Sequence, residues 1–168
     1  APMSMHIANG MFGAVIIDPT DLDKVDREYV MVASELYLGA DGQSANASLL
    51  SALAPNAMAF NGVPFQYKAH PIQVKTNERV RVWVMDAGPN LATTFHVVGT
   101  QFDTVWREGA YVIRGGGSGG GWSQVLSLGA AEGGFVEFTP LEAGHYAFVN
   151  HALSLAEKGQ TGVFEVTD

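Results

Sequence analysis

The chain contains 168 residues, of which 47% are hydrophobic and 15% are charged, and its formal net charge is −8. This composition is typical of a globular domain with a sizeable core, and it excludes a disordered chain and a membrane-spanning helix, because no apolar run approaches ~20 residues. The negative charge disfavours nucleic acid as a partner, and the absence of cysteine excludes disulfides, iron–sulfur clusters and a complete blue-copper site within this chain.

The predicted elements are mainly short strands separated by turn residues. The apolar run at residues 11–17 is the first, and the charged stretch at 21–27 reads as a linker. Short helices are predicted at 46–53 and 152–158, and the glycine-rich run 115–121 is predicted to be a flexible surface loop. The other predicted strands are 29–38, 79–85, 94–99, 104–107, 111–114, 124–128, 135–139, 145–149 and 162–166. Their regular spacing indicates an antiparallel sandwich or barrel.

Histidine is the residue type that carries most of the possible chemistry, since imidazole is the commonest metal ligand. His6 lies five residues before Met11, so an imidazole and a thioether could reach one soft metal. His151 follows an apolar strand, where a site at the rim of a sandwich is often found. A surface or hydrogen-bonded core histidine remains the alternative at each position.

Three segments, taken together, resemble copper nitrite reductases and the related two-domain multicopper oxidases of bacteria. They are MHIANGMFGAVIIDP at 5–19, FHVVGTQFDTVW at 95–106 and GHYAFVNHALSLAEKGQTGVFEV at 144–166. The resemblance implies an all-β, cupredoxin-like Greek-key β-sandwich. It further implies that residues 1–18 are the C-terminal strands of a first cupredoxin domain, 19–27 a linker, and 28–168 a complete second cupredoxin domain.

The resemblance also assigns roles to single residues. His6 matches the second histidine of a type 1 copper site, and Met11 matches its axial methionine. His151 matches the ligand that the second domain gives to the catalytic copper. His96 matches the catalytic histidine that supplies a proton in nitrite reductases, although an equivalent histidine binds copper in oxygen-reducing relatives. The family's cysteine and active-site aspartate would lie upstream of Ala1.

The implied function is that of the C-terminal part of a copper oxidoreductase that converts nitrite to nitric oxide. Electrons would pass from a type 1 copper to a catalytic copper at a subunit interface of a homotrimer, with nitrite or oxygen as small-molecule substrate and a separate electron donor. A periplasmic or secreted bacterial location follows from the same resemblance. This chain alone, without the cysteine, is expected to be inactive. An oxygen-reducing, laccase-like oxidase and a non-catalytic cupredoxin-like module are the alternatives.

The remaining candidates are interpreted as follows. His70 is expected to be structural or exposed, and Asp103 to be a turn or hydrogen-bonding residue. His145 shares a strand face with His151 by alternation, so a metal-binding role stays open. The three tryptophans are expected to be packing residues: Trp83, Trp106 and Trp122.

Overall fold

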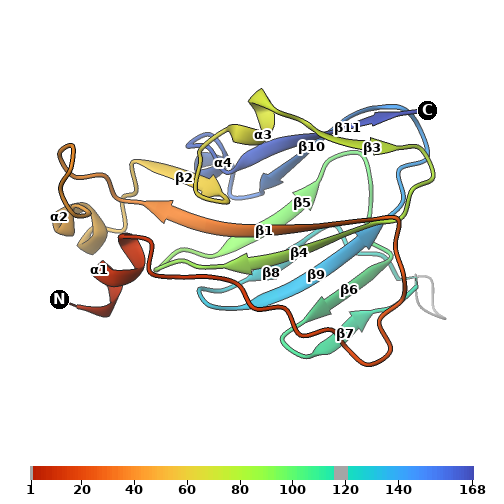
Figure 1. Cartoon of the computed structure of the whole chain (residues 1–168), viewed down its shortest axis with the longest axis horizontal. Coiled ribbons are helices and arrows are strands. Elements are labelled where there is room, and N and C mark those ends of the chain that lie inside the picture. Colours follow the sequence, from red (N-terminus) through yellow and green to blue (C-terminus); the bar gives the residue numbers. More distant parts are fainter. Residues whose placement is uncertain (1, 116–120) are drawn as a thin grey trace.

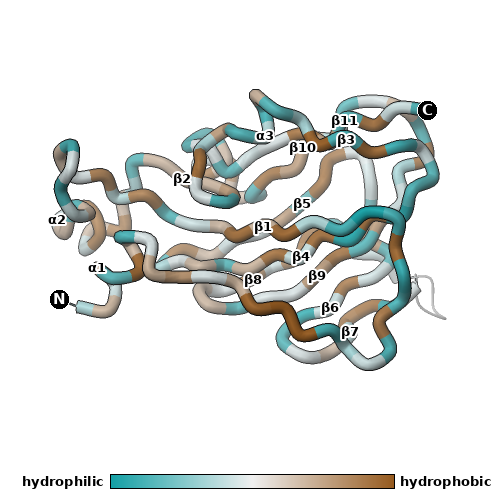
Figure 2. The backbone as a smooth tube through the Cα atoms, in the orientation of Figure 1, coloured by the Kyte–Doolittle hydropathy of each residue, from teal (hydrophilic) through white to brown (hydrophobic). Residues whose placement is uncertain are grey.

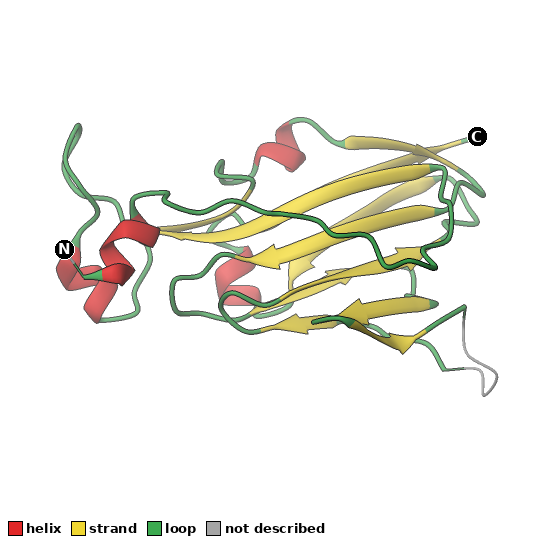
Figure 3. Ribbon diagram, turned by 60° about the horizontal axis from the view of Figure 1, so that its bottom comes forward, coloured by secondary structure: helices red, strands yellow, loops and turns green. Residues whose placement is uncertain are grey.

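Two β-sheets packed face to face form the body of the protein (Figures 1 and 3). The computed structural model describes residues 2–115 and 121–168. The larger part of the predicted glycine-rich loop, residues 116–120, lies outside the described residues. The predicted all-β sandwich is confirmed.

The first sheet has six strands in the spatial order β2 (Ala57–Phe60), β1 (Arg27–Leu36), β4 (Val80–Asp86), β9 (Gly133–Phe138), β6 (Thr104–Arg107) and β7 (Ala110–Ile113). The second has five in the order β3 (Ile72–Lys75), β11 (Thr161–Thr167), β10 (Gly144–Asn150), β5 (Thr93–Val97) and β8 (Leu126–Leu128). Four short helices are described: α1 (Met3–Ala8), α2 (Ala47–Ser51), α3 (Gln66–Ala69) and α4 (Leu153–Ala156).

The sheets are mixed rather than purely antiparallel. Strands β1 and β4 pair in parallel, as do β11 and β3, and the other pairs are antiparallel. Parallel neighbours require a long crossover connection, and here α2, β2, α3 and β3 lie between β1 and β4 in the chain. The chain also changes sheet between β4 and β5 and again between β9 and β10, which is typical of Greek-key sandwiches.

The hydrophobic core lies between the two sheets, and both inner faces supply it. Val80, Val82 and Val84 of β4 are all buried and face this core. Aromatic rings from β10 and β11 meet them from the other side, with the ring centroids of Phe148 and Phe164 5.0 Å apart. Figure 2 shows these apolar strands as brown segments inside the sandwich.

The N-terminal segment differs from the prediction. Residues 3–8 form helix α1, and residues 11–17 form no strand. Val15 is 86% exposed, and residues 14–17 line an apolar groove with Trp83 and Trp106 on the outer face of the first sheet. An apolar run becomes a strand only when a strand edge is available to pair with it, and none of the described strands pairs with this one. The assignment of residues 1–18 to another domain stays a prediction.

Arginines hold the segment predicted as a linker against the first sheet. The buried Arg81 guanidinium donates to the Asp23 carbonyl and forms an ion pair with Glu137 at 2.6 Å. Arg114 donates to the Asp21 carbonyl at 2.6 Å. The segment 19–27 is therefore bound along the sandwich (Figure 1) rather than free.

The ion pair between Arg81 and Glu137 should be costly to break. Glu137→Gln leaves the buried Arg81 guanidinium with only the half-exposed carboxylate of Glu28, 3.1 Å away, and we expect the free energy of unfolding to fall by about 3–5 kcal/mol. Glu78→Gln is the matched control, because its partner Arg27 is half-exposed and such pairs contribute only about 0–1 kcal/mol. Urea unfolding measures both. Equal losses in the two variants would show that burial of the Glu137 pair has no special weight.

Two carboxylates lie buried next to the start of β5. Glu35 accepts hydrogen bonds from the amides of Asn90 and Leu91 at 2.6 Å each and from the Tyr37 hydroxyl. Asp86 is 1% exposed, and its Oδ1 accepts from the Gly88 amide at 2.9 Å. Burial, with a smaller contribution from the Glu35 charge, raises the pKa of Asp86 to about 7. Glu35 thus has three hydrogen-bond donors, whereas the pKa of Asp86 is set mainly by its burial.

This raised pKa predicts how stability depends on pH. Folded Asp86 retains its proton to a higher pH than unfolded Asp86, so the folded state loses stability as pH rises from about 4 to about 7. Asp86→Asn removes the titration and should raise the free energy of unfolding at pH 8, relative to the wild type, by up to about 4 kcal/mol. Urea unfolding at pH 5 and pH 8 measures how the free energy of unfolding changes with pH. The control Glu157→Gln, at an exposed position, should show the same change as the wild type. A slope unchanged in Asp86→Asn would contradict the prediction.

Candidate metal centre

His96 lies on β5 with its side chain on the outer face of the second sheet. Its neighbours Phe95 and Val97 are fully buried in the core, so alternation directs His96 and Thr94 outward. His96 is nevertheless only 9% exposed, because the segment at Gln124 and Val125 covers it. The protein therefore holds one imidazole near its surface but largely shielded from water.

His151 meets His96 at the end of β10. Val149 is paired with His96 in the antiparallel register, and His151 follows two residues later on the same face. The two imidazole centroids are 5.2 Å apart, with an interplanar angle of 72°. His151 is exposed, and a hollow of about 490 Å³ is lined by Thr94, His96, Gln124, Val125 and His151. A small molecule or an ion can therefore contact both imidazoles.

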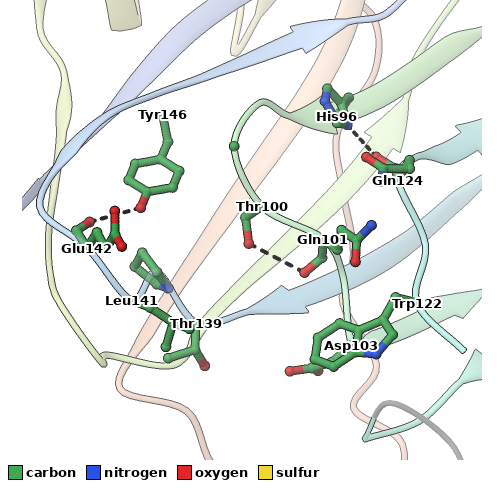
Figure 4. A pocket seen from close by; sticks show the side chains of 12 residues that line it. His96, Thr100, Gln101, Asp103, Trp122, Gln124, Thr139, Leu141, Glu142 and Tyr146 are labelled. Carbon is green, nitrogen blue, oxygen red and sulfur yellow. Dashed lines mark hydrogen bonds between the residues drawn. The ribbon is translucent and has the colours of Figure 1, made fainter. Parts of the chain in front are cut away.

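A backbone contact fixes the protonation pattern of His96. Its Nδ1 lies within hydrogen-bond distance of the Gln124 carbonyl oxygen (Figure 4). A carbonyl only accepts hydrogen bonds, so Nδ1 carries a hydrogen. The neutral ring then has its lone pair on Nε2, which is the atom left to accept or return a proton, or to bind a metal. Gln124 was not among the predicted site residues, since its backbone rather than its side chain acts.

A second and larger hollow lies on the other side of His96. It measures about 730 Å³, and Figure 4 shows Trp122, Gln101 and Tyr146 around it. His96 and Gln124 line both hollows. Trp122 is 54% exposed, so its predicted packing role is wrong. Its place beside the hollow explains the exposure, because the ring contributes to a wall and not to the core.

His6 and Met11 lie close together at the opposite end of the sequence. His6 is in the last turn of α1, and the Met11 amide donates to the His6 carbonyl at 3.0 Å. Both side chains are exposed. Their imidazole and thioether match the donor types of a soft copper site, which lacks its thiolate here because the sequence has no cysteine.

The described residues do not complete a metal centre by themselves. Residues 2–115 and 121–168 contain no group of three or more His, Asp or Glu side chains that could hold a metal ion. The pair of His96 and His151 supplies two imidazoles at most, and a catalytic copper needs further ligands. A metal ion bound by this pair would need ligands in addition to these two imidazoles.

The other candidates lie away from this pair. His145 is exposed at the far end of β10, roughly 20 Å along the strand from His151 at 3.3 Å per residue. His70 is exposed at the end of α3, as predicted. Asp103 forms an ion pair with Arg79 at 2.7 Å, in agreement with its predicted hydrogen-bonding role. No helix among the described residues is long and apolar enough to cross a membrane.

Comparison with known proteins now adds to this geometry. A family model described as multicopper oxidase matches residues 41–168. The chain belongs to the multicopper oxidase family. A copper-containing nitrite reductase of Neisseria meningitidis serogroup A is 36% identical over 99% of this chain, and the match covers 44% of that relative. The corresponding enzyme of Neisseria gonorrhoeae is also 36% identical, with 43% of its length covered.

Solved structures of multicopper oxidase family members share the cupredoxin-like sandwich. A copper nitrite reductase from Nitrosomonas europaea superimposes with a TM-score of 0.84 at 29% identity, covering 99% of this chain and 59% of that one. A solved multicopper oxidase superimposes with a TM-score of 0.80 at 24% identity, which supports the fold alone. The predicted family and fold are confirmed, and copper, the predicted cofactor, is named in these relatives. The chain spans less than half the length of the curated relatives it matches.

Proposed function

We propose that this chain is the C-terminal part of a copper-dependent nitrite reductase. The observation that carries the proposal is the pair of His96 and His151, 5.2 Å apart at the rim of a cupredoxin-like sandwich, in a chain 36% identical to copper-containing nitrite reductases. In this proposal residues 28–168 are the second cupredoxin domain. Residues 1–18 end the first domain, and 19–27 join the two.

His151 would be a ligand of the catalytic copper, with the other imidazoles coming from a first domain. Copper, when bound, supplies the electron for the reaction NO₂⁻ + e⁻ + 2H⁺ → NO + H₂O. His96 would take up a proton from solvent on Nε2 and, as the imidazolium, give it to the nitrite oxygen that leaves as water, and solvent would supply the second proton. The Gln124 carbonyl keeps the Nδ1 hydrogen in place, so Nε2 stays the atom that exchanges protons.

His6 and Met11 would hold the type 1 copper together with a cysteine and a second histidine outside this chain. The isolated chain would then be inactive and lack the blue colour of a copper–thiolate site. Closed symmetry with three subunits would bring His151 of one subunit to the first domain of its neighbour. A small-molecule substrate, a separate electron donor and a periplasmic or secreted location complete the proposal.

An oxygen-reducing oxidase is the second candidate. The observation in its favour is that the imidazole of His96, whose Nε2 carries the lone pair, lies 5.2 Å from that of His151 between ring centroids. A centre with several copper ions needs more imidazole ligands, and His96 would supply a second one from this domain. The two functions differ in whether His96 moves protons or binds metal.

The full-length protein provides the test. We expect two copper ions per subunit by elemental analysis, an intense blue or green absorption, and nitric oxide formation from nitrite with a reduced donor. Light scattering should give the mass of a trimer. Oxygen consumption without nitrite reduction would favour the second candidate, and a copper-free protein without either activity would show a non-catalytic module.

A further inference from the structure

Asn150 is a fully buried polar residue directly before the exposed His151. Its Oδ1 accepts hydrogen bonds from the Thr94 hydroxyl at 2.9 Å, the Thr94 amide at 3.2 Å and the Ala152 amide at 3.1 Å. Its Nδ2 donates to Gln160 Oε1 at 2.6 Å and to the Ala92 carbonyl at 3.4 Å. Both amide hydrogens and the carboxamide oxygen are therefore used.

These hydrogen bonds hold the backbone at His151 and at the residue that follows it. The Asn150 side chain binds the amide of Ala152, the residue after His151, and the His151 amide donates to the Thr94 carbonyl at 2.7 Å. Thr94 lies two residues before His96 on β5. The turn that carries His151 is thus tied to the strand that carries His96.

Gln160 extends the network into the body of the protein. It is also fully buried, its carbonyl accepts from the Asn150 amide at 3.0 Å, and its Nε2 donates to the Ala59 carbonyl on β2 at 3.3 Å. A buried amide with every hydrogen bond satisfied admits one arrangement of its partners, because any displacement leaves polar groups unpaired at about 1–3 kcal/mol each. An apolar side chain would fill the space without fixing the turn.

We infer that Asn150 is a positioning residue that sets the placement of the His151 imidazole relative to His96. The inference rests on the proposed function, in which His151 binds the catalytic copper. Asn150 is buried and touches the backbone rather than the imidazole, so it acts only through the turn at residues 150–152. Its effect should therefore appear in metal affinity and in the geometry of the metal site.

Hydrogen exchange on the unaltered full-length protein is the first test, and it needs no variant. The amides of His151 and Ala152 belong to exposed residues, yet the first donates to the partly buried Thr94 and the second to the fully buried Asn150. We expect them to be as strongly protected from exchange as amides inside β10. Exchange at the rate of an unstructured chain would show that the turn is not fixed and would overturn the inference.

Copper affinity is the second test. Asn150→Ala in the full-length protein should raise the dissociation constant for the catalytic copper about 10–100-fold, the usual effect of losing an outer partner of a metal site. The electron paramagnetic resonance signal of that copper should change as well. Val74→Ala is the matched control, since Val74 is a buried core residue on β3 near the opposite end of β10. It should lower stability while leaving affinity and signal unchanged.

Three possible results distinguish failure of the inference about Asn150 from failure of the proposed function. Weakened copper in Asn150→Ala with unchanged copper in Val74→Ala supports the inference. Unchanged affinity and signal in Asn150→Ala, while His151→Ala loses the catalytic copper, overturns the inference and leaves the proposed function standing. Copper retained in His151→Ala overturns both.

Discussion

Replacement of His151 by alanine in the full-length protein should remove the catalytic copper and abolish turnover. His151 is the exposed imidazole of the pair, and without it only His96 of the pair remains next to the proposed metal site. The blue absorption should persist, because the cysteine, His6 and Met11 of the proposed type 1 site are untouched. Elemental analysis should fall from two copper ions to one per subunit.

His145→Ala is the control for this experiment. His145 is an exposed histidine on the same face of the same strand, but it lies at the end of β10 away from His151. The variant should keep both copper ions and the wild-type rate. If His151→Ala instead keeps full copper content and turnover, the assignment of His151 as a ligand is wrong.

His96→Ala should lower the rate of nitrite reduction about 10²–10⁴-fold, the usual contribution of a positioned proton donor. Its Nε2 is the exchangeable position that the contact with the Gln124 carbonyl leaves available, and alanine has no proton to deliver. Copper content should remain at two ions per subunit, because His96 is not a ligand in the proposed nitrite reductase. Steady-state rates and copper content together measure the effect.

The same variant separates the two proposed functions. Loss of copper from His96→Ala would mean that His96 binds metal, which favours the oxygen-reducing oxidase. His70→Ala, at an exposed position on the end of α3, should change neither rate nor copper content. A wild-type rate in His96→Ala would exclude both roles for this histidine.

The fold was largely predictable where burial alone determines the pattern. The strand predicted at 79–85 is present as β4, and Val80, Val82 and Val84 on one of its faces are buried. The opposite face is buried as well, which alternation does not predict, because Arg81 pairs there with Glu137 and Trp83 packs on Phe135 with centroids 4.7 Å apart. The parallel pairing of β1 and β4 was also missed, because strand patterns carry no information on direction.

The candidate site was predictable only through resemblance. Nothing local to His96 or His151 in the sequence indicates that they meet, because their contact depends on the register between β5 and β10. The strand predicted at residues 11–17 was wrong for a related reason: an apolar run shows that a segment avoids water without showing what covers it. Asn150 had one available signal, a polar amide at the end of an otherwise apolar strand.

The strand order has a consequence for the growing chain as it leaves the ribosome. Strand β1 can pair with β2 and β4 as soon as residue 86 has emerged, but β3 at residues 72–75 pairs only with β11 among the described strands. Since β11 ends at Thr167, the edge of the second sheet stays open until almost all of the 168 residues have been synthesised. A nascent chain stopped before residue 161 would leave the strand edges of β10 and β3 that pair with β11 open to neighbouring chains. Formation of β11 covers both edges and so lowers the risk of aggregation.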